Sequence, residues 1–153
     1  MARGNSTDVS TGVRRKLGKP VVLFLEDDVD SRTIHAIALR DAGLDVSEAG
    51  SIGEARLVLG DVAPEVIIAD RTLPDGDGFV DFVASLRRDP RFADTPCIAF
   101  TGATGAKDIE DAVLAGCDVY LVKPISPEVV VARVREQIMA RATGVPTRRR
   151  RSV

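Results

Sequence analysis

The chain has 153 residues, of which 44% are hydrophobic and 29% are charged, and its formal net charge is −2. These values are those of an ordinary soluble globular protein, most simply one domain with tails. No apolar run approaches the roughly 20 residues needed to span a bilayer, and the N-terminus lacks the apolar stretch of a secretory signal. We therefore expect a cytoplasmic protein that does not act at a membrane.

The charges are distributed unevenly along the chain. Residues 1–19 hold five basic side chains and one acidic one, residues 141–153 hold five basic and no acidic ones, and the remainder has about two acids for every base. An acidic body with basic ends does not look like a nucleic-acid-binding domain. We expect a flexible basic arm at 1–19, a folded domain at 20–142 and a flexible Arg-rich tail at 143–153.

The first expected strand and helix occupy the start of the domain. Pro20 introduces an apolar run over 21–25, which predicts a buried strand that ends in Glu26-Asp27-Asp28. The helix that follows is expected to be capped by Ser31 or Asp30 and to end at Gly43. Its expected buried face consists of Ile34, Ile37 and Ala38, and His35 is expected at the surface or boundary.

A second, weaker strand is expected over 44–49. Ser51 and Glu54 then have the spacing of a capping box, and the helix that they open is expected to run to Gly60. A short apolar run over 66–69 predicts a fully buried strand, after which Asp70 stands where the strand meets solvent. The next helix is amphipathic, with apolar side chains at i, i+3, i+4 and i+7: Phe79, Phe82, Val83 and Leu86.

Two further strand–helix units complete the pattern. A strand over 96–100 ends at Thr101, and a strand over 119–122 ends at Lys123-Pro124. The helix between them is expected to place Ile109, Ala112 and Val113 on one face and to stop at Gly116. Ser126 and Pro127 predict the start of the last helix, with a stripe of Val130, Val134 and Ile138. Cys97 and Cys117 have no nearby His and form no Cys-x-x-Cys motif, which predicts buried, reduced thiols.

Five strands that alternate with five helices predict an α/β fold with a doubly wound parallel sheet. Ligands of such sheets bind outside the carboxyl ends of the strands. The chemistry-bearing residues expected at those ends are two acids after the first strand, an acid after the third, a hydroxyl after the fourth and an amine after the fifth: Glu26, Asp27, Asp70, Thr101 and Lys123.

Clustered carboxylates repel one another unless a cation lies between them. Oxygen ligands from two or three acids suit Mg²⁺, which usually completes its shell with waters and a phosphate. Lys123 and Thr101 could contact phosphoryl oxygens, and aspartate is a known phosphoryl acceptor, so Asp70 is the expected nucleophile.

Over residues 20–140 the sequence resembles the receiver domain of two-component response regulators. The matching elements are Glu26-Asp27, Asp70 in Ile-Ile-Ala-Asp-x-x-Leu-Pro-x-x-x-Gly, Thr101, Tyr120 and Lys123-Pro124. Thr72 and Gly76 are less usual at their positions, and Asp28 is an extra acid next to the pair. The resemblance implies a flavodoxin-like three-layer sandwich with strand order 2-1-3-4-5, and a phosphoacceptor of two-component or phosphorelay signalling that is not an enzyme beyond its own phosphorylation and dephosphorylation.

The resemblance also implies a role for each site residue. Asp70 would accept a phosphoryl group from a phosphohistidine of a sensor kinase or phosphotransfer protein. Asp27 and Asp70 would bind Mg²⁺ directly, Glu26 through water and Thr72 through its backbone carbonyl. Thr101 and Lys123 would contact the phosphoryl group, and Thr101 with Tyr120 would form the switch. A downstream partner protein would bind the face of the fourth helix, fifth strand and fifth helix, because too few residues follow for an effector domain.

Two alternatives remain open from the sequence. The chain could be a receiver-like interaction module that is never phosphorylated, although it retains both acids and the lysine. It also resembles, more weakly, haloacid-dehalogenase-type phosphatases, in which Asp28 would be the nucleophile and Asp30 the acid–base group. Arg32 stands where that motif usually has Thr or Val.

Overall fold

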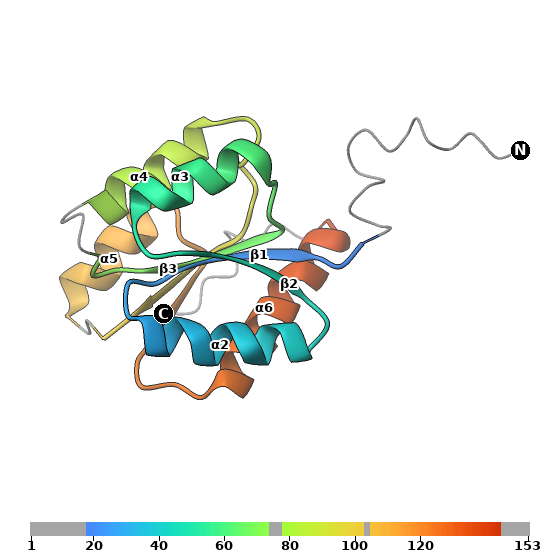
Figure 1. Cartoon of the computed structure of the whole chain (residues 1–153). Helices are drawn as coiled ribbons and strands as arrows, with labels where there is room; N and C mark the ends of the chain where they lie inside the picture. Colours follow the sequence, from blue (N-terminus) through green and yellow to red (C-terminus); the bar gives the residue numbers. More distant parts are fainter. Residues whose placement is uncertain (1–17, 74–77, 103–104, 145–153) are drawn as a thin grey trace, which may run out of the picture.

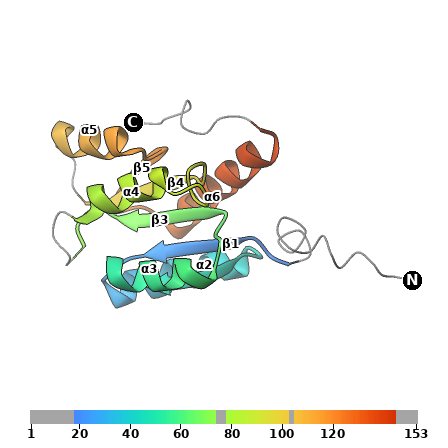
Figure 2. The ribbon, with the colours of Figure 1, turned by 90° about the horizontal axis from the view of Figure 1, so that it is seen from above.

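The computed structural model describes residues 18–73, 78–102 and 105–144. Its centre is a parallel five-stranded sheet with the order β2-β1-β3-β4-β5, as the resemblance implied. The strands are β1 (Val21–Leu25), β2 (Asp45–Ala49), β3 (Val66–Asp70), β4 (Cys97–Thr101) and β5 (Val119–Val122). Figure 2 shows β1 and β3 side by side with the same direction.

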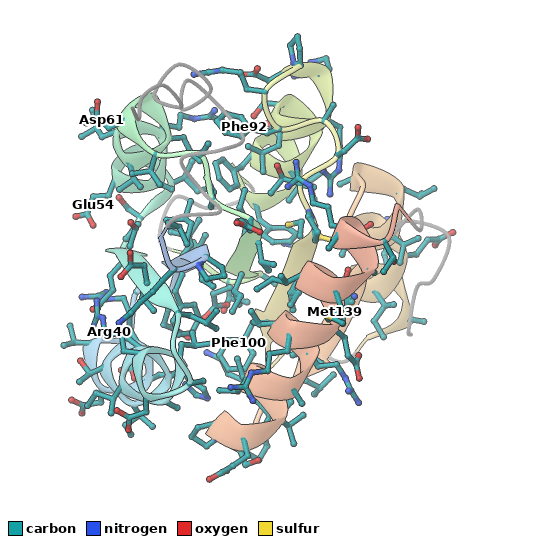
Figure 3. All side chains as sticks on the ribbon, turned by 90° about the vertical axis from the view of Figure 1, so that its right-hand side faces the viewer. Arg40, Glu54, Asp61, Phe92, Phe100 and Met139 are labelled. Carbon is teal, nitrogen blue, oxygen red and sulfur yellow. The ribbon has the colours of Figure 1, made fainter. Side chains whose placement is uncertain are left out.

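Helices cover both faces of the sheet, which makes three layers (Figure 1). Helices α3 (Ile52–Asp61), α4 (Gly78–Arg88) and α5 (Ala106–Ala115) pack on one face. Helices α2 (Val29–Asp41) and α6 (Pro127–Ala142) pack on the other. All five residues of β3 and of β4 are buried, because both strands lie inside the sheet and are covered on both faces. Figure 3 shows Phe100 of β4 in the interior and Arg40, Glu54 and Asp61 at the periphery.

The start of α2 differs from the expectation. The N-cap is Asp28, whose carboxylate accepts a hydrogen bond from the backbone N of Ser31 at 2.8 Å, so neither Ser31 nor Asp30 caps this helix. This contact also accounts for the extra acid beside Glu26-Asp27. Asp28 has a structural task at the helix terminus, where a carboxylate satisfies a free backbone N–H.

The buried face of α2 was also predicted wrongly. Ile34 and Ile37 are more than half exposed, whereas His35, Ala36 and Leu39 are buried. The imidazole of His35 contacts the rings of Phe24 and Phe100 edge-on, with centroid distances of 5.8 and 5.1 Å. Its Nδ1 donates to the carbonyl of Ser31 at 2.9 Å, and this bond together with the two rings favours burial of the imidazole over a surface position.

The other helices largely follow the expected patterns. Ser51 Oγ accepts from the backbone N of Glu54, as in the predicted capping box, and the expected apolar stripe of α4 is buried. In α5 only Ala112 of the expected stripe is fully buried. Cys97 and Cys117 are free buried thiols with 3.8 Å between their sulfurs, as predicted. Within the described ranges, no helix is long and apolar enough to cross a bilayer.

A partly buried arginine joins the loops at the amino ends of β4 and β5. Arg87 of α4 donates to the carbonyls of Phe92, Ala93, Thr95 and Gly116, and its Nη2 lies 3.0 Å from the carboxylate of Asp118. The same carboxylate accepts from the backbone N of Cys97 at 2.9 Å. The network satisfies loop carbonyls that would otherwise be buried without partners.

Residues 1–17 and 145–153, to which most of the expected basic arm and tail belong, lie outside the described residues, as do Pro74–Asp77 of the acceptor motif. Flexibility of the two ends therefore stays a prediction.

Candidate functional site

The sheet order brings the expected residues together at one edge. Glu26 follows β1, Asp70 ends β3, Thr101 ends β4 and Lys123 follows β5. The register pairs Leu25 with Ala69 and Thr101 with Val122, so these strands end at nearly the same level. Glu26, Asp70 and Thr101 are buried. Burial of two neighbouring acids, Glu26 and Asp70, is unusual in a protein.

Lys123 is the cation that links the two buried acids. Its Nζ donates to Oε1 of Glu26 at 2.7 Å and to Oδ2 of Asp70 at 2.9 Å. The ammonium also lies 5.0 Å from the ring centroid of Phe100, within the range of a cation–π contact. One positive charge therefore offsets two negative ones, and the cluster keeps a net negative charge.

Asp70 is held by the two residues that follow it. Its Oδ1 accepts from the backbone N of Thr72 at 2.7 Å and from the Thr72 hydroxyl at 2.9 Å. Burial raises the pKa of Asp70, but the hydrogen bonds from Thr72 and Lys123 outweigh it, and the pKa lies below its ordinary value. Asp70 therefore stays ionised at neutral pH, as a nucleophilic carboxylate must.

Glu26 differs in the direction of its pKa shift. Burial raises its pKa above the ordinary value, and the hydrogen bond from Lys123 only partly offsets this effect. Oε1 also accepts from the Ser31 hydroxyl at 3.3 Å, and Oε2 accepts from the backbone N of Asp28 at 3.1 Å. Of the two neighbouring carboxyl groups, Glu26 is thus the one that protonates first.

Three acids at this edge could share a cation. Carboxylate oxygens of Glu26, Asp27 and Asp70 all lie within 4.8 Å of one another. Asp27 is exposed, so it leaves one side of the cluster open to water and ligands. Hard oxygen donors with room for waters fit Mg²⁺, and a second cation would relieve the repulsion that Lys123 leaves.

Thr101 ends β4, and Tyr120 lies within β5, three residues before Lys123, where it is already buried, with 8% of its surface exposed. The side chain packs in the core beneath α4 and α5. Burial raises the pKa of Tyr120, and the charge of Asp108 on α5 raises it further. Any movement of this ring would therefore begin from a buried position.

Several contacts at this edge were not predicted from the sequence. The side-chain bond of Thr72 to Asp70 was not expected, because only its backbone carbonyl had been considered. Arg71 lies over the ring of Phe79, with its Nη2 3.6 Å from Oδ1 of Asp108. Arg71 directly follows an acid at a strand end, and this adjacency is the one signal that could have drawn attention to it.

A family model described as the response regulator receiver domain matches residues 22–135. The chain belongs to the response regulator receiver family. The sheet order, with an acid after β1, an acid at the end of β3 and a lysine after β5, agrees with this membership. Receiver domains are phosphoacceptors of two-component signalling, generally without a catalytic activity toward other substrates, and they bind Mg²⁺ at an acidic pocket.

Curated relatives of the receiver include two transcriptional regulators. RpaA from Synechocystis is a DNA-binding dual master transcriptional regulator, 36% identical over 129 residues, which cover 83% of this chain and 52% of that protein. PhoB from Pseudomonas aeruginosa, the phosphate regulon regulator, is 34% identical over 115 residues, which cover 74% and 49%. The chain spans about half the length of these two relatives.

Solved structures show the same fold. The chemotaxis response regulator CheY4 of Vibrio cholerae is 27% identical, with a TM-score of 0.72, and the match covers 78% of this chain and 98% of that one. A CheY-like receiver protein from Methanospirillum hungatei has a TM-score of 0.77 at 20% identity, with coverage of 83% and 99%. At 20% identity, the similarity to the Methanospirillum hungatei protein shows a shared fold alone.

Proposed function

We propose that Asp70 of this receiver accepts a phosphoryl group from a phosphohistidine of a sensor kinase or phosphotransfer protein. A carboxylate oxygen of Asp70 would attack the phosphorus, the P–N bond would break, and the imidazole nitrogen would leave with its electron pair and take up a proton. The observation that carries the proposal is the placement of Lys123, whose ammonium contacts Asp70 and Glu26 together. Phosphoryl transfer depends mainly on positioning and on neutralisation of charge.

The metal would be held by Asp27 and Asp70 directly, by Glu26 through water and by the backbone carbonyl of Thr72. When bound, Mg²⁺ would neutralise charge on the phosphoryl oxygens. Lys123 would turn from Asp70 to a phosphoryl oxygen and keep its bond to Glu26, and the Thr101 hydroxyl would contact another oxygen. The unit that carries this function would be the domain of residues 20–142.

The output would pass through Thr101 and Tyr120 to the face formed by α5, β5 and α6. A phosphoryl group adds negative charge and strong acceptor oxygens. Thr101 would move toward it, and the buried ring of Tyr120 would repack in the space beside β5. Leu114 of α5 and Met139 of α6 are exposed at 77% and 64%, and a protein partner could cover such apolar side chains.

Incubation with acetyl phosphate and Mg²⁺, followed by intact-mass spectrometry, tests the acceptor. We expect the wild type to gain one phosphoryl group and Asp70→Asn to gain none. Asp28→Asn is the matched control, because it removes the same charge while asparagine still caps α2. If Asp28→Asn alone lost labelling, the phosphatase-like assignment of Asp28 would replace this proposal, and labelling that persisted in Asp70→Asn would remove Asp70 from the role.

A further inference from the structure

Arg32 of α2 contacts the strand end that carries the acid pair, although it is not one of the expected site residues. Its Nη1 donates to the backbone carbonyl of Glu26 at 2.7 Å, and its Nε donates to Oε1 of Glu48 on β2 at 3.1 Å. The side chain is 19% exposed. The guanidinium therefore ties α2, β1 and β2 together at the edge where the acids gather.

The bond to Glu26 acts on the peptide that leads to Asp27. The carbonyl of Glu26 and the backbone N of Asp27 belong to one planar unit, so a donor that fixes the oxygen also fixes the orientation in which Asp27 leaves the strand. Asp27 is exposed. Its distance from Glu26 and Asp70 thus depends on this peptide plane.

The surroundings of Arg32 keep the guanidinium in this place. Glu48 is itself held from the other side by Arg40, whose Nη2 lies 3.0 Å from its Oε2. Gly50 leaves room for the guanidinium, since a Cβ there would lie only 3.2 Å from Nη1 of Arg32. The planar guanidinium of Arg32 is hydrogen-bonded on two sides and is therefore held rigidly. The single ammonium of a lysine could not reproduce both bonds.

We propose that Arg32 is a positioning residue of the Mg²⁺ site, which holds the carbonyl of Glu26 and thereby the acid Asp27. The inference rests on the proposed metal site. Groups that orient metal ligands without touching the metal commonly affect affinity by about 10–100-fold.

The direction in which Mg²⁺ affinity changes separates a positioning role of Arg32 from a simple effect of its charge. Loss of a positive charge beside an acidic cluster should by itself strengthen the attraction for Mg²⁺. A weaker affinity in Arg32→Ala can therefore not come from the charge. Arg40→Ala is the matched control, because it removes the same charge from the same network and a bond to Glu48 but no bond to Glu26.

The experiment is a calorimetric titration of each full-length variant with magnesium chloride at fixed ionic strength, after thermal unfolding has shown that each is folded. We expect about tenfold weaker binding in Arg32→Ala, and an affinity at or above that of the wild type in Arg40→Ala. Arg32→Lys keeps the charge but cannot bridge Glu26 and Glu48, so it should also bind Mg²⁺ weakly. This variant replaces Arg32→Ala in the test if the alanine variant does not fold.

The outcomes separate this inference from the proposed metal site. Wild-type affinity in Arg32→Ala, or full recovery in Arg32→Lys, would overturn the positioning role while the metal site stood. Equal weakening in Arg32→Ala and Arg40→Ala would also overturn it, since the bond to Glu26 would then not matter. If the wild type bound no Mg²⁺, the metal site and the inference would fail together.

Discussion

The Nζ of Lys123 lies 2.9 Å from Oδ2 of Asp70, although the two residues are 53 positions apart in the chain. The same ammonium lies 2.7 Å from Oε1 of Glu26. It therefore joins a carboxyl group whose pKa is raised by burial to one whose pKa is lowered by hydrogen bonds. The two acids consequently respond to pH in opposite ways.

The first prediction concerns stability against pH without Mg²⁺. Between the ordinary pKa of glutamate, about 4.3, and the higher folded-state pKa of Glu26, the folded protein binds more protons than the unfolded chain. Glu26 thus contributes stability as pH falls from neutral through its folded pKa. Asp70 acts oppositely: its contribution is present above about 3.9 and is lost as pH falls through its lowered pKa.

Urea denaturation at a series of pH values should therefore show a stabilisation on mild acidification in the wild type that is smaller in Glu26→Gln. Both proteins share all other titrating groups, so the difference reports Glu26 together with its effect on the pKa values of Asp70 and Lys123. Identical pH slopes in the two proteins would contradict a raised pKa for Glu26.

The second prediction separates two adjacent acids. Asp27→Ala should lose most Mg²⁺ affinity and keep or slightly increase stability, because it relieves repulsion among the acids. Asp28→Ala should keep most of the affinity and lose about 1 kcal/mol of stability, because it removes the N-cap of α2. Calorimetric Mg²⁺ titration and urea denaturation of both variants give the two readouts, and a reversed pattern would move the ligand from Asp27 to Asp28.

The third prediction uses Tyr120 as a reporter. The chain has one tyrosine and no tryptophan, so its tyrosine fluorescence comes from this side chain alone. Addition of beryllofluoride with Mg²⁺ should change this fluorescence in the wild type and leave it unchanged in Asp70→Asn. Thr101→Ala should still be phosphorylated by acetyl phosphate but should lose most of the fluorescence change. A full change in Thr101→Ala would show that Tyr120 responds by another route.

The fourth prediction concerns Gly116, which ends α5 with φ at +121°. A Cβ there would lie 2.7 Å from Cγ of Arg87, and Arg87 cannot move aside without loss of its bonds to Asp118 and four carbonyls. Gly43 is a matched control: its φ is +92°, but a Cβ would meet nothing within 4 Å. Gly43→Ala should cost about 1–3 kcal/mol from backbone strain alone, and Gly116→Ala should cost more. Equal costs by urea denaturation would show that Arg87 adapts freely.

Much of the fold and the site could be predicted from the sequence because the decisive signals are local. Short apolar runs that end in Glu26, Asp70 and Lys123 indicate both buried strands and the edge where ligands bind. The buried face of α2 could not be predicted in this way, because His35 is buried by aromatic partners on β1 and β4 that no local pattern indicates. The positions of the apolar residues alone predicted that Ile34 and Ile37 would be buried instead.

The contacts of Arg32 and Arg87 were missed for a different reason. Both guanidinium groups bind backbone carbonyls, at Glu26 in one case and in the loops before β4 and β5 in the other. Every residue has a carbonyl, so the sequence contains no pattern that marks an acceptor of this kind. Such contacts become visible only when the positions of the loops are known.

The place of β5 in the sheet has a consequence for biosynthesis. Among the residues that the structure describes, this strand is the last in sequence and lies at the sheet edge, where it pairs with β4 alone. A nascent chain exposes Glu26, Asp27 and Asp70 to the cell before Lys123 has left the ribosome, and the lysine reaches Glu26 across 97 residues only after β5 has docked. Until then the acids have no ammonium between them. Until β5 has docked, this edge of the sheet therefore lacks the ammonium on which the proposed phosphoryl transfer depends.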